Sequence, residues 1–80
     1  MPTDNNIYLA ILQKVGSNIK TMRQDKHMNQ KELAFACDME KAGMSRIESG
    51  KSNITFFTLC RISEALNIPI IDIIGGAQAA

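Results

Sequence analysis

Apolar residues recur along the first third of the chain with the spacing of an amphipathic helix. Steps of four, three, four and three residues separate Tyr8, Leu12, Val15, Ile19 and Met22. A repeat near 3.6 residues places these side chains on one face of a helix. The spacing predicts a helix from about residue 7 to residue 25, with its lysines at 14 and 20 facing solvent.

Two short helices separated by a three-residue turn are predicted in the middle of the chain. Asn29 is a favourable N-cap, and Glu32 stands three residues later as in a capping box, so the second helix occupies about residues 30–36. Residues 37–39 form the turn, where Asp38 is one of the few non-glycine residue types that tolerate a positive φ. The third helix spans about residues 40–49 and ends at a glycine, Gly50.

Two further helices complete the chain. Thr55 caps the fourth helix, whose apolar face is expected to carry Phe56, Leu59, Ile62 and Leu66. Asn67 ends it, and Pro69 opens a short fifth helix over residues 70–74 because proline suits a first turn. No segment shows convincing strand alternation. We therefore expect an all-α domain of five helices over residues 7–74, with flexible ends at residues 1–6 and 75–80.

Composition agrees with a small helical domain and limits its chemistry. Eighty residues suffice for one domain, and the hydrophobic fraction of 45% with few aromatic residues favours packed helices. The net charge of +1 shows no global basic bias. Any nucleic-acid binding must therefore rely on positive charge gathered on one face, since phosphate neutralisation supplies the non-specific affinity.

The remaining chemistry of the chain is sparse. Cys37 and Cys60 lack a CxxC pairing and, with His27, lack zinc-ligand spacing, so we interpret both cysteines as reduced packing residues and expect no metal or cofactor. No phosphate-binding glycine loop, nucleophile elbow or catalytic cluster occurs, which argues against an enzyme. No apolar run is long enough to span a bilayer and no secretion signal is present, so a cytoplasmic protein without membrane contact is expected.

The two middle helices and their turn have the organisation of a helix-turn-helix. Ala34 suits a place where two helices cross closely, and Met39 is the apolar residue of the turn. The polar residues left on the outer face of the third helix are Lys41, Ser45, Arg46 and Ser49.

Several stretches in and around this element resemble one known family. They are residues 29–34 (NQKELA), residues 44–51 (MSRIESGK), the first-helix residues Gly16, Ile19, Lys20 and Arg23, and residues 58–66 (TLCRISEAL). Together they resemble the Xre/phage-repressor (lambda repressor-like) helix-turn-helix family over residues 15–74. This resemblance implies a five-helix domain that inserts its third helix into the major groove of double-stranded DNA.

The resemblance also implies roles for individual residues. It places base reading at Lys41, Ala42, Ser45 and Arg46, and the chemistry agrees because arginine can bond guanine N7 and O6 bidentately. Phosphate contacts fall on Asn29 and Gln30 and on the loop residues Ser49, Lys51, Ser52 and Asn53. Arg23 and Glu48 occupy positions that form a buried ion pair in the family, which would join the first helix to the third.

Three residues depart from the pattern of the family. Asp38 stands where the turn normally carries glycine, and an acid there is unfavourable near DNA. Glu40 replaces the usual serine or threonine cap of the third helix. Gly43 within this helix costs about 1 kcal/mol of helix preference.

Apolar residues at both ends of the domain exceed what its own core requires. We expect Ile7, Ile11, Ile71 and Ile74 to form a dimer interface. A two-fold homodimer would bind a palindromic operator with half-sites about one helical turn apart.

The leading hypothesis is a sequence-specific transcriptional regulator, favoured as a repressor. The alternative is an interaction module of the antitoxin type, in which a protein partner is primary and DNA binding secondary. A redox-sensing role for the two cysteines is a third, weaker hypothesis. Phage, restriction-modification and toxin–antitoxin contexts all remain open at this point.

Overall fold

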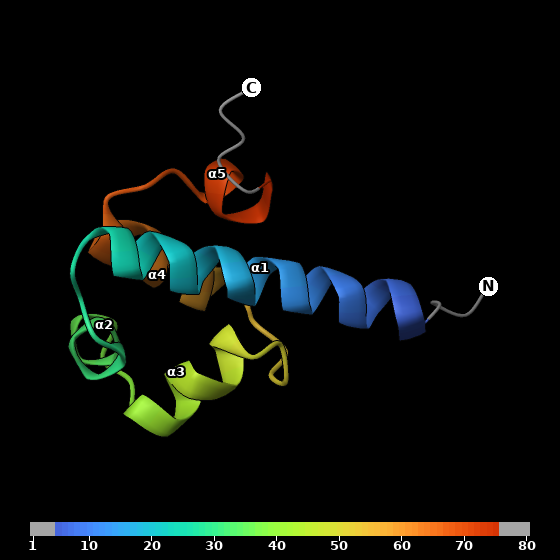
Figure 1. The fold of residues 1–80 in the computed structure, drawn as a ribbon, viewed down its shortest axis with the longest axis horizontal. Coiled ribbons are helices and arrows are strands. Elements are labelled where there is room, and N and C mark those ends of the chain that lie inside the picture. The colour runs from blue at the N-terminus through green and yellow to red at the C-terminus, as the bar shows by residue number, and fades with distance from the viewer. Residues whose placement is uncertain (1–4, 76–80) are drawn as a thin grey trace.

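The computed structural model describes residues 5–75, which form five helices (Figure 1). These are α1 (Asn5–Asp25), α2 (Gln30–Ala36), α3 (Lys41–Glu48), α4 (Phe56–Leu66) and α5 (Ile70–Gly75). The predicted all-α fold is confirmed, with α1 beginning two residues earlier than its apolar stripe indicated. The flexible ends predicted at residues 1–6 and 75–80 lie mostly outside the described residues.

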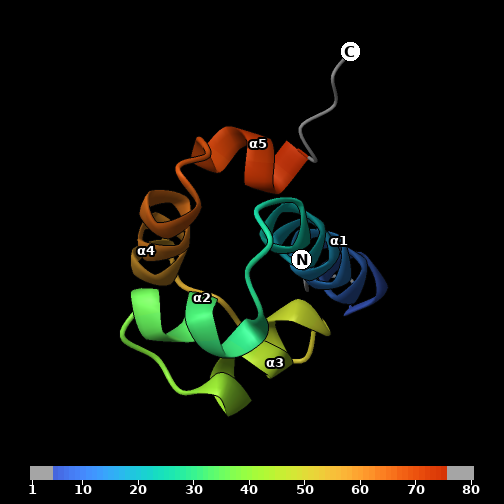
Figure 2. The same cartoon turned by 60° about the vertical axis from the view of Figure 1, so that its left-hand side comes forward.

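The helices surround a single core. In Figure 1, α1 runs the length of the molecule, with α5 above it, α2 and α3 below it, and α4 behind. The view along α1 in Figure 2 shows the five helices arranged around a common centre. The side chains buried there are Val15, Ile19, Met22, Leu33, Ala34, Cys37, Met44, Ile47, Leu59, Ile62, Leu66 and Ile73.

Local capping explains where the helices begin and end. The capping box of α2 is confirmed: Glu32 N–H donates to Asn29 Oδ1 and Asn29 N–H donates to Glu32 Oε1, both at 2.8 Å. Thr58 N–H donates to Thr55 Oγ1 at the start of α4, and Asn67 ends that helix in the left-handed region (φ 57°). Asp38 takes the positive φ expected of it (59°). His27 has a similar φ of 59°, which the sequence did not indicate.

Three residues expected in the core are exposed instead. Phe56 is 75% exposed, because the first turn of α4 extends beyond the core and the buried residues of this helix begin only at Leu59. Tyr8 is exposed because the N-terminal part of α1 projects beyond the other helices (Figure 1). Cys60 is exposed, so only Cys37 packs in the core, where burial raises its thiol pKa and the charge of Arg61 partly opposes that shift.

None of the helices between residues 5 and 75 has the length and apolar character that crossing a bilayer would require. Within the same residues, no cluster of three or more histidine, cysteine or acidic side chains could hold a metal ion.

Candidate nucleic-acid interface

The turn between α2 and α3 fixes the angle of a compact helix pair. Met39 N–H donates to the carbonyl of Ala34 at 2.8 Å, and Met39 packs half-buried against the core. Ala34 is itself buried, so its small side chain allows the close approach of the two helices. The buried face of α3 carries Met44, Ile47 and Glu48, which directs its other side outward.

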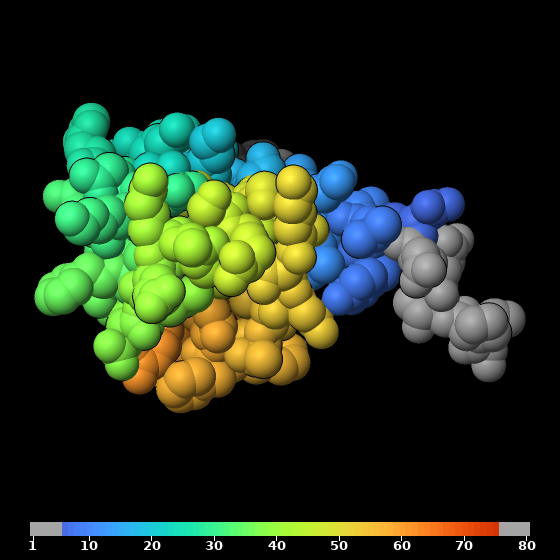
Figure 3. Space-filling view, turned by 90° about the horizontal axis from the view of Figure 1, so that it is seen from below, coloured from blue at the N-terminus to red at the C-terminus, as the bar shows by residue number. Residues whose placement is uncertain are grey.

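The outer face of α3 is presented to solvent. Figure 3 looks onto this face, with α3 and the loop that follows it at the centre. The four predicted base-reading residues, Lys41, Ala42, Ser45 and Arg46, are all exposed there. Their side chains are therefore accessible to a groove of DNA, although Glu40 makes no side-chain cap at the start of the helix.

A buried ion pair joins α1 to α3. Arg23 Nε donates to Glu48 Oε2 at 2.7 Å and an Nη atom donates to Glu48 Oε1 at 3.0 Å, with both residues almost fully buried. The other Nη donates to the carbonyl of Met28, which ties the α1–α2 connection into the same network. Hydrogen bonding to Glu48 raises the pKa of Arg23 while burial acts in the opposite direction. The two parallel hydrogen bonds between Arg23 and Glu48 hold α3 at a fixed orientation relative to α1.

The two phosphate residues predicted at the start of α2 have different roles in the structure. Asn29 uses its side-chain oxygen and its backbone N–H in the capping box. Its side-chain NH₂ is the donor left to bind a ligand. Gln30 Nε2 donates to Glu48 Oε1 at 3.0 Å, which leaves one of its two amide protons for an outside acceptor. The sequence did not indicate this link between Gln30 and the ion pair.

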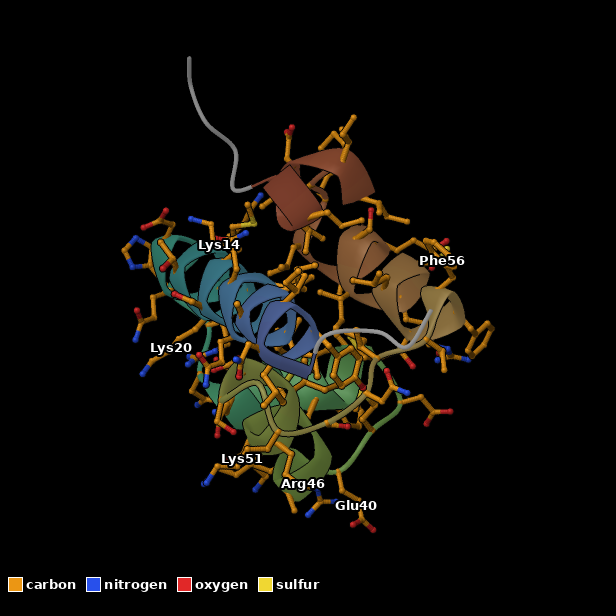
Figure 4. The ribbon with its side chains drawn as sticks, turned by 90° about the vertical axis from the view of Figure 1, so that its right-hand side faces the viewer. Lys14, Lys20, Glu40, Arg46, Lys51 and Phe56 are labelled. Atoms are coloured by element: carbon orange, nitrogen blue, oxygen red, sulfur yellow. The ribbon has the colours of Figure 1, made fainter. Side chains whose placement is uncertain are left out.

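The predicted phosphate loop follows α3 directly. Lys51 is exposed, and its backbone N–H donates to the carbonyl of Arg46 at 2.9 Å. Gly50 has a φ of 75°, and a Cβ there would lie 2.7 Å from Gln13 Cα, so the loop packs directly on α1. Ser49 and Asn53 are also exposed, whereas Ser52 is half-buried. Arg46 and Lys51 lie on the same side of the molecule (Figure 4).

Sequence reasoning missed one cation on this side. Lys20 of α1 lines a small hollow together with Gln30, Ser45, Glu48 and Ser49. The sequence placed it on the solvent side of the first helix and in the family match, but assigned it no contact with DNA. In Figure 4 it lies on the same side of α1 as Lys51. The tertiary packing of α1 against α3 brings Lys20 there, so no local pattern in the sequence could have revealed it.

The isoleucines predicted to form a dimer interface are exposed on a separate surface. Ile7, Ile11 and Ile74 line one apolar groove between α1 and α5, which Ala10, Lys14 and Val15 complete. Ile71 is 76% exposed but is not among the residues that line the groove. Asn18 Nδ2 donates to the carbonyl of Ile73 at 2.7 Å and so fixes α5 against α1 beside it.

Comparison with known proteins decides the family. The model of the helix-turn-helix family matches residues 19–73, which include all of α2, α3 and α4. The chain belongs to the helix-turn-helix family. It is a DNA-binding transcriptional regulator, as the sequence predicted.

The chain is similar to named regulators in sequence and in structure. It is 37% identical to the control protein C.BamHI of Bacillus amyloliquefaciens over 71 residues, covering 88% of this chain and 83% of that protein. It is also 37% identical over 57 residues to the ImmF control region 10 kDa protein of Bacillus phage phi105, covering 71% of this chain and 63% of that protein. The restriction-modification controller protein C.AhdI of Aeromonas hydrophila superimposes with a TM-score of 0.78 at 25% identity, over 80% of this chain and 97% of that one.

Proposed function

We propose that this protein is a cytoplasmic transcriptional repressor of the restriction-modification controller type, which binds a palindromic operator as a homodimer. The observation that carries the proposal is the exposed outer face of α3, held in place by the buried pair of Arg23 and Glu48. The similarity to C.BamHI and C.AhdI supports the controller type.

Base reading falls to α3. Arg46 is exposed and makes no side-chain hydrogen bond or ion pair within residues 5–75. Its planar guanidinium carries paired donors that match guanine N7 and O6. Lys41 can reach the same acceptors, and the methyl group of Ala42 can contact a thymine methyl. A rigid helix is needed for this readout, since each good bidentate contact contributes about 1–3 kcal/mol of discrimination only when its geometry is held.

The backbone contacts come from residues on either side of α3. The free amide protons of Asn29 and Gln30 and the exposed ammonium of Lys51 can each approach a phosphate oxygen. Ser49, Ser52 and Asn53 complete the loop that would follow the DNA backbone. Such contacts position the protein without reading its sequence.

Dimerisation would use the isoleucine groove. Exposed apolar surface shared by Ile7, Ile11 and Ile74 is costly in water and would be covered by the same surface of a second copy. Two copies related by a two-fold axis would present two α3 helices to consecutive major-groove half-sites.

The test is selection of bound DNA from random duplexes with the wild type, Arg46→Ala and Arg46→Lys. We expect the wild type to enrich a palindromic motif and both variants to lose preference at one position of each half-site. Arg46→Lys keeps the positive charge and loses the paired donors of the planar guanidinium, so it separates base reading from general attraction to DNA.

Absence of any enriched motif with the wild type would contradict sequence-specific binding. A motif that is unchanged in Arg46→Ala would contradict the role given to Arg46. A motif that Arg46→Lys retains in full would show that Arg46 acts through its charge alone.

A further inference from the structure

Three helices meet at a small hollow beside α3. Its walls are Lys20 from α1, Gln30 from α2, Ser45 and Glu48 from α3, and the C-cap residue Ser49, and its volume is about 180 Å³. Ser49, the C-cap of α3, lies one turn after Ser45 and on the same side of the helix. The hollow therefore adjoins the surface that faces DNA in the proposed function.

Hydrogen-bond donors are available in this hollow. The ammonium of Lys20 makes no hydrogen bond or ion pair within residues 5–75, and the hydroxyl of Ser45 makes no hydrogen bond there either. Gln30 Nε2 carries a second proton besides the one donated to Glu48. The hydroxyl of Ser49 differs, since it donates to the carbonyl of Arg46 at 3.1 Å.

The charge of the hollow favours an anion despite the carboxylate in its wall. Arg23 engages both carboxylate oxygens of Glu48 at 2.7 and 3.0 Å, so this pair contributes little net charge. The ammonium of Lys20 is then the charge at the hollow that has no partner within residues 5–75. A group with several acceptor oxygens and a negative charge fits such a set of donors, and the DNA backbone presents such groups at every nucleotide.

We propose that Lys20, Gln30 and Ser45 together bind one phosphate of the DNA backbone, so that α1 takes a direct part in DNA binding. This rests on the proposed function. It adds Lys20 to the interface and changes the role of Ser45, which the sequence assigned to base reading. The site would anchor α3 on the side of the helix that faces α1.

The experiment measures the salt dependence of binding by fluorescence anisotropy with two duplexes of equal length, one bearing the selected motif and one unrelated. The variants are Lys20→Gln, Lys26→Gln and Ser45→Ala, each checked for its helix content by circular dichroism. Lys26→Gln is the matched control, because it removes the same charge from an exposed lysine just after α1 that lines neither the hollow nor the isoleucine groove.

For Lys20→Gln we expect weaker binding to both duplexes by a similar factor. The slope of log affinity against log salt concentration should fall by about 0.9 for each bound subunit, because one phosphate contact is lost. Ser45→Ala should weaken binding while the selected motif stays the same. Lys26→Gln should leave the slope unchanged.

The phosphate site is contradicted if Lys20→Gln keeps the salt-dependence slope of the wild type, or if Lys26→Gln lowers that slope by the same amount. A changed motif in Ser45→Ala also overturns it, since Ser45 would then read a base. Wild-type protein that binds neither duplex overturns the proposed function and this site together, which separates that failure from the others.

Discussion

The two halves of α1 have similar apolar content and opposite environments. In the C-terminal half, Val15, Ile19 and Met22 are buried and Arg23 is paired with Glu48. In the N-terminal half, Ile7 and Ile11 are 59% and 54% exposed, and Leu9 is exposed beside them.

The difference follows from what each half packs against. The C-terminal half meets α3 so closely that a Cβ on Gly16 would overlap the carbonyl oxygen of Ile47 and lie 2.7 Å from that of Glu48. The N-terminal half projects past α3 (Figure 1), and an apolar groove lies between it and α5. One half of the helix therefore stabilises its own domain, and the other leaves exposed apolar surface, which the proposed homodimer would cover.

Glu48→Ala should have the largest effect, because it breaks the contact of the C-terminal half with α3. Removing one partner of a buried pair costs about 3–5 kcal/mol, since the guanidinium of Arg23 stays buried without its counter-charge. In a domain of this size the Tm should fall by roughly 15–30 °C. Thermal unfolding followed by circular dichroism measures the change.

Glu64→Ala is the control for that experiment, since Glu64 is an exposed acid on α4 and makes no side-chain ion pair within residues 5–75. Its free energy of unfolding should change by less than about 0.5 kcal/mol. Equal losses in the two variants would contradict a special role for the buried pair.

Gly16→Ala tests the same contact through the backbone. The added methyl meets carbonyl groups that cannot rotate away, so α1 and α3 must separate slightly at a cost of about 1–3 kcal/mol. The better helix preference of alanine offsets only about 1 kcal/mol of that cost. Chemical denaturation should therefore show a net loss of stability.

Gly43→Ala is the matched helical control. A Cβ there meets only the flexible methyl end of Met39, at 3.3 Å, so the helix preference should dominate and stability should rise by about 1 kcal/mol. Should Gly16→Ala prove as stabilising as Gly43→Ala, the close approach of α1 and α3 would be contradicted.

The sequence predicted the features of the fold that depend on neighbouring residues. Caps at Asn29, Thr55 and Asn67 define helix ends through hydrogen bonds or backbone angles of adjacent residues, and all three appear as expected. The position of Arg23 opposite Glu48 came from the family resemblance, because a pairing across 25 residues has no local signal.

Features that depend on distant packing were not predictable in the same way. The bond from Gln30 to Glu48 and the place of Lys20 in the hollow arise only when α1, α2 and α3 meet. Phe56 matched the apolar spacing of α4 but lies in a turn that extends past the core. Spacing shows which face of a helix is apolar and not how far along the helix a neighbour covers it.

Ile11→Glu should have the smallest effect on the domain itself and the clearest effect on its assembly. Ile11 is exposed in the described chain, so the free energy of unfolding of the monomer should change by less than about 0.5 kcal/mol. A carboxylate in the apolar groove shared with Ile7 and Ile74 would lose its hydration in a dimer, which disfavours association. Light scattering after size exclusion should show a dimer for the wild type and a monomer for this variant.

Leu9→Glu is the control, because Leu9 is an exposed apolar residue two positions earlier on α1 that does not line the groove. This variant should remain a dimer. A wild type that is monomeric at high micromolar concentration would contradict the assignment of the N-terminal half of α1 to a second copy.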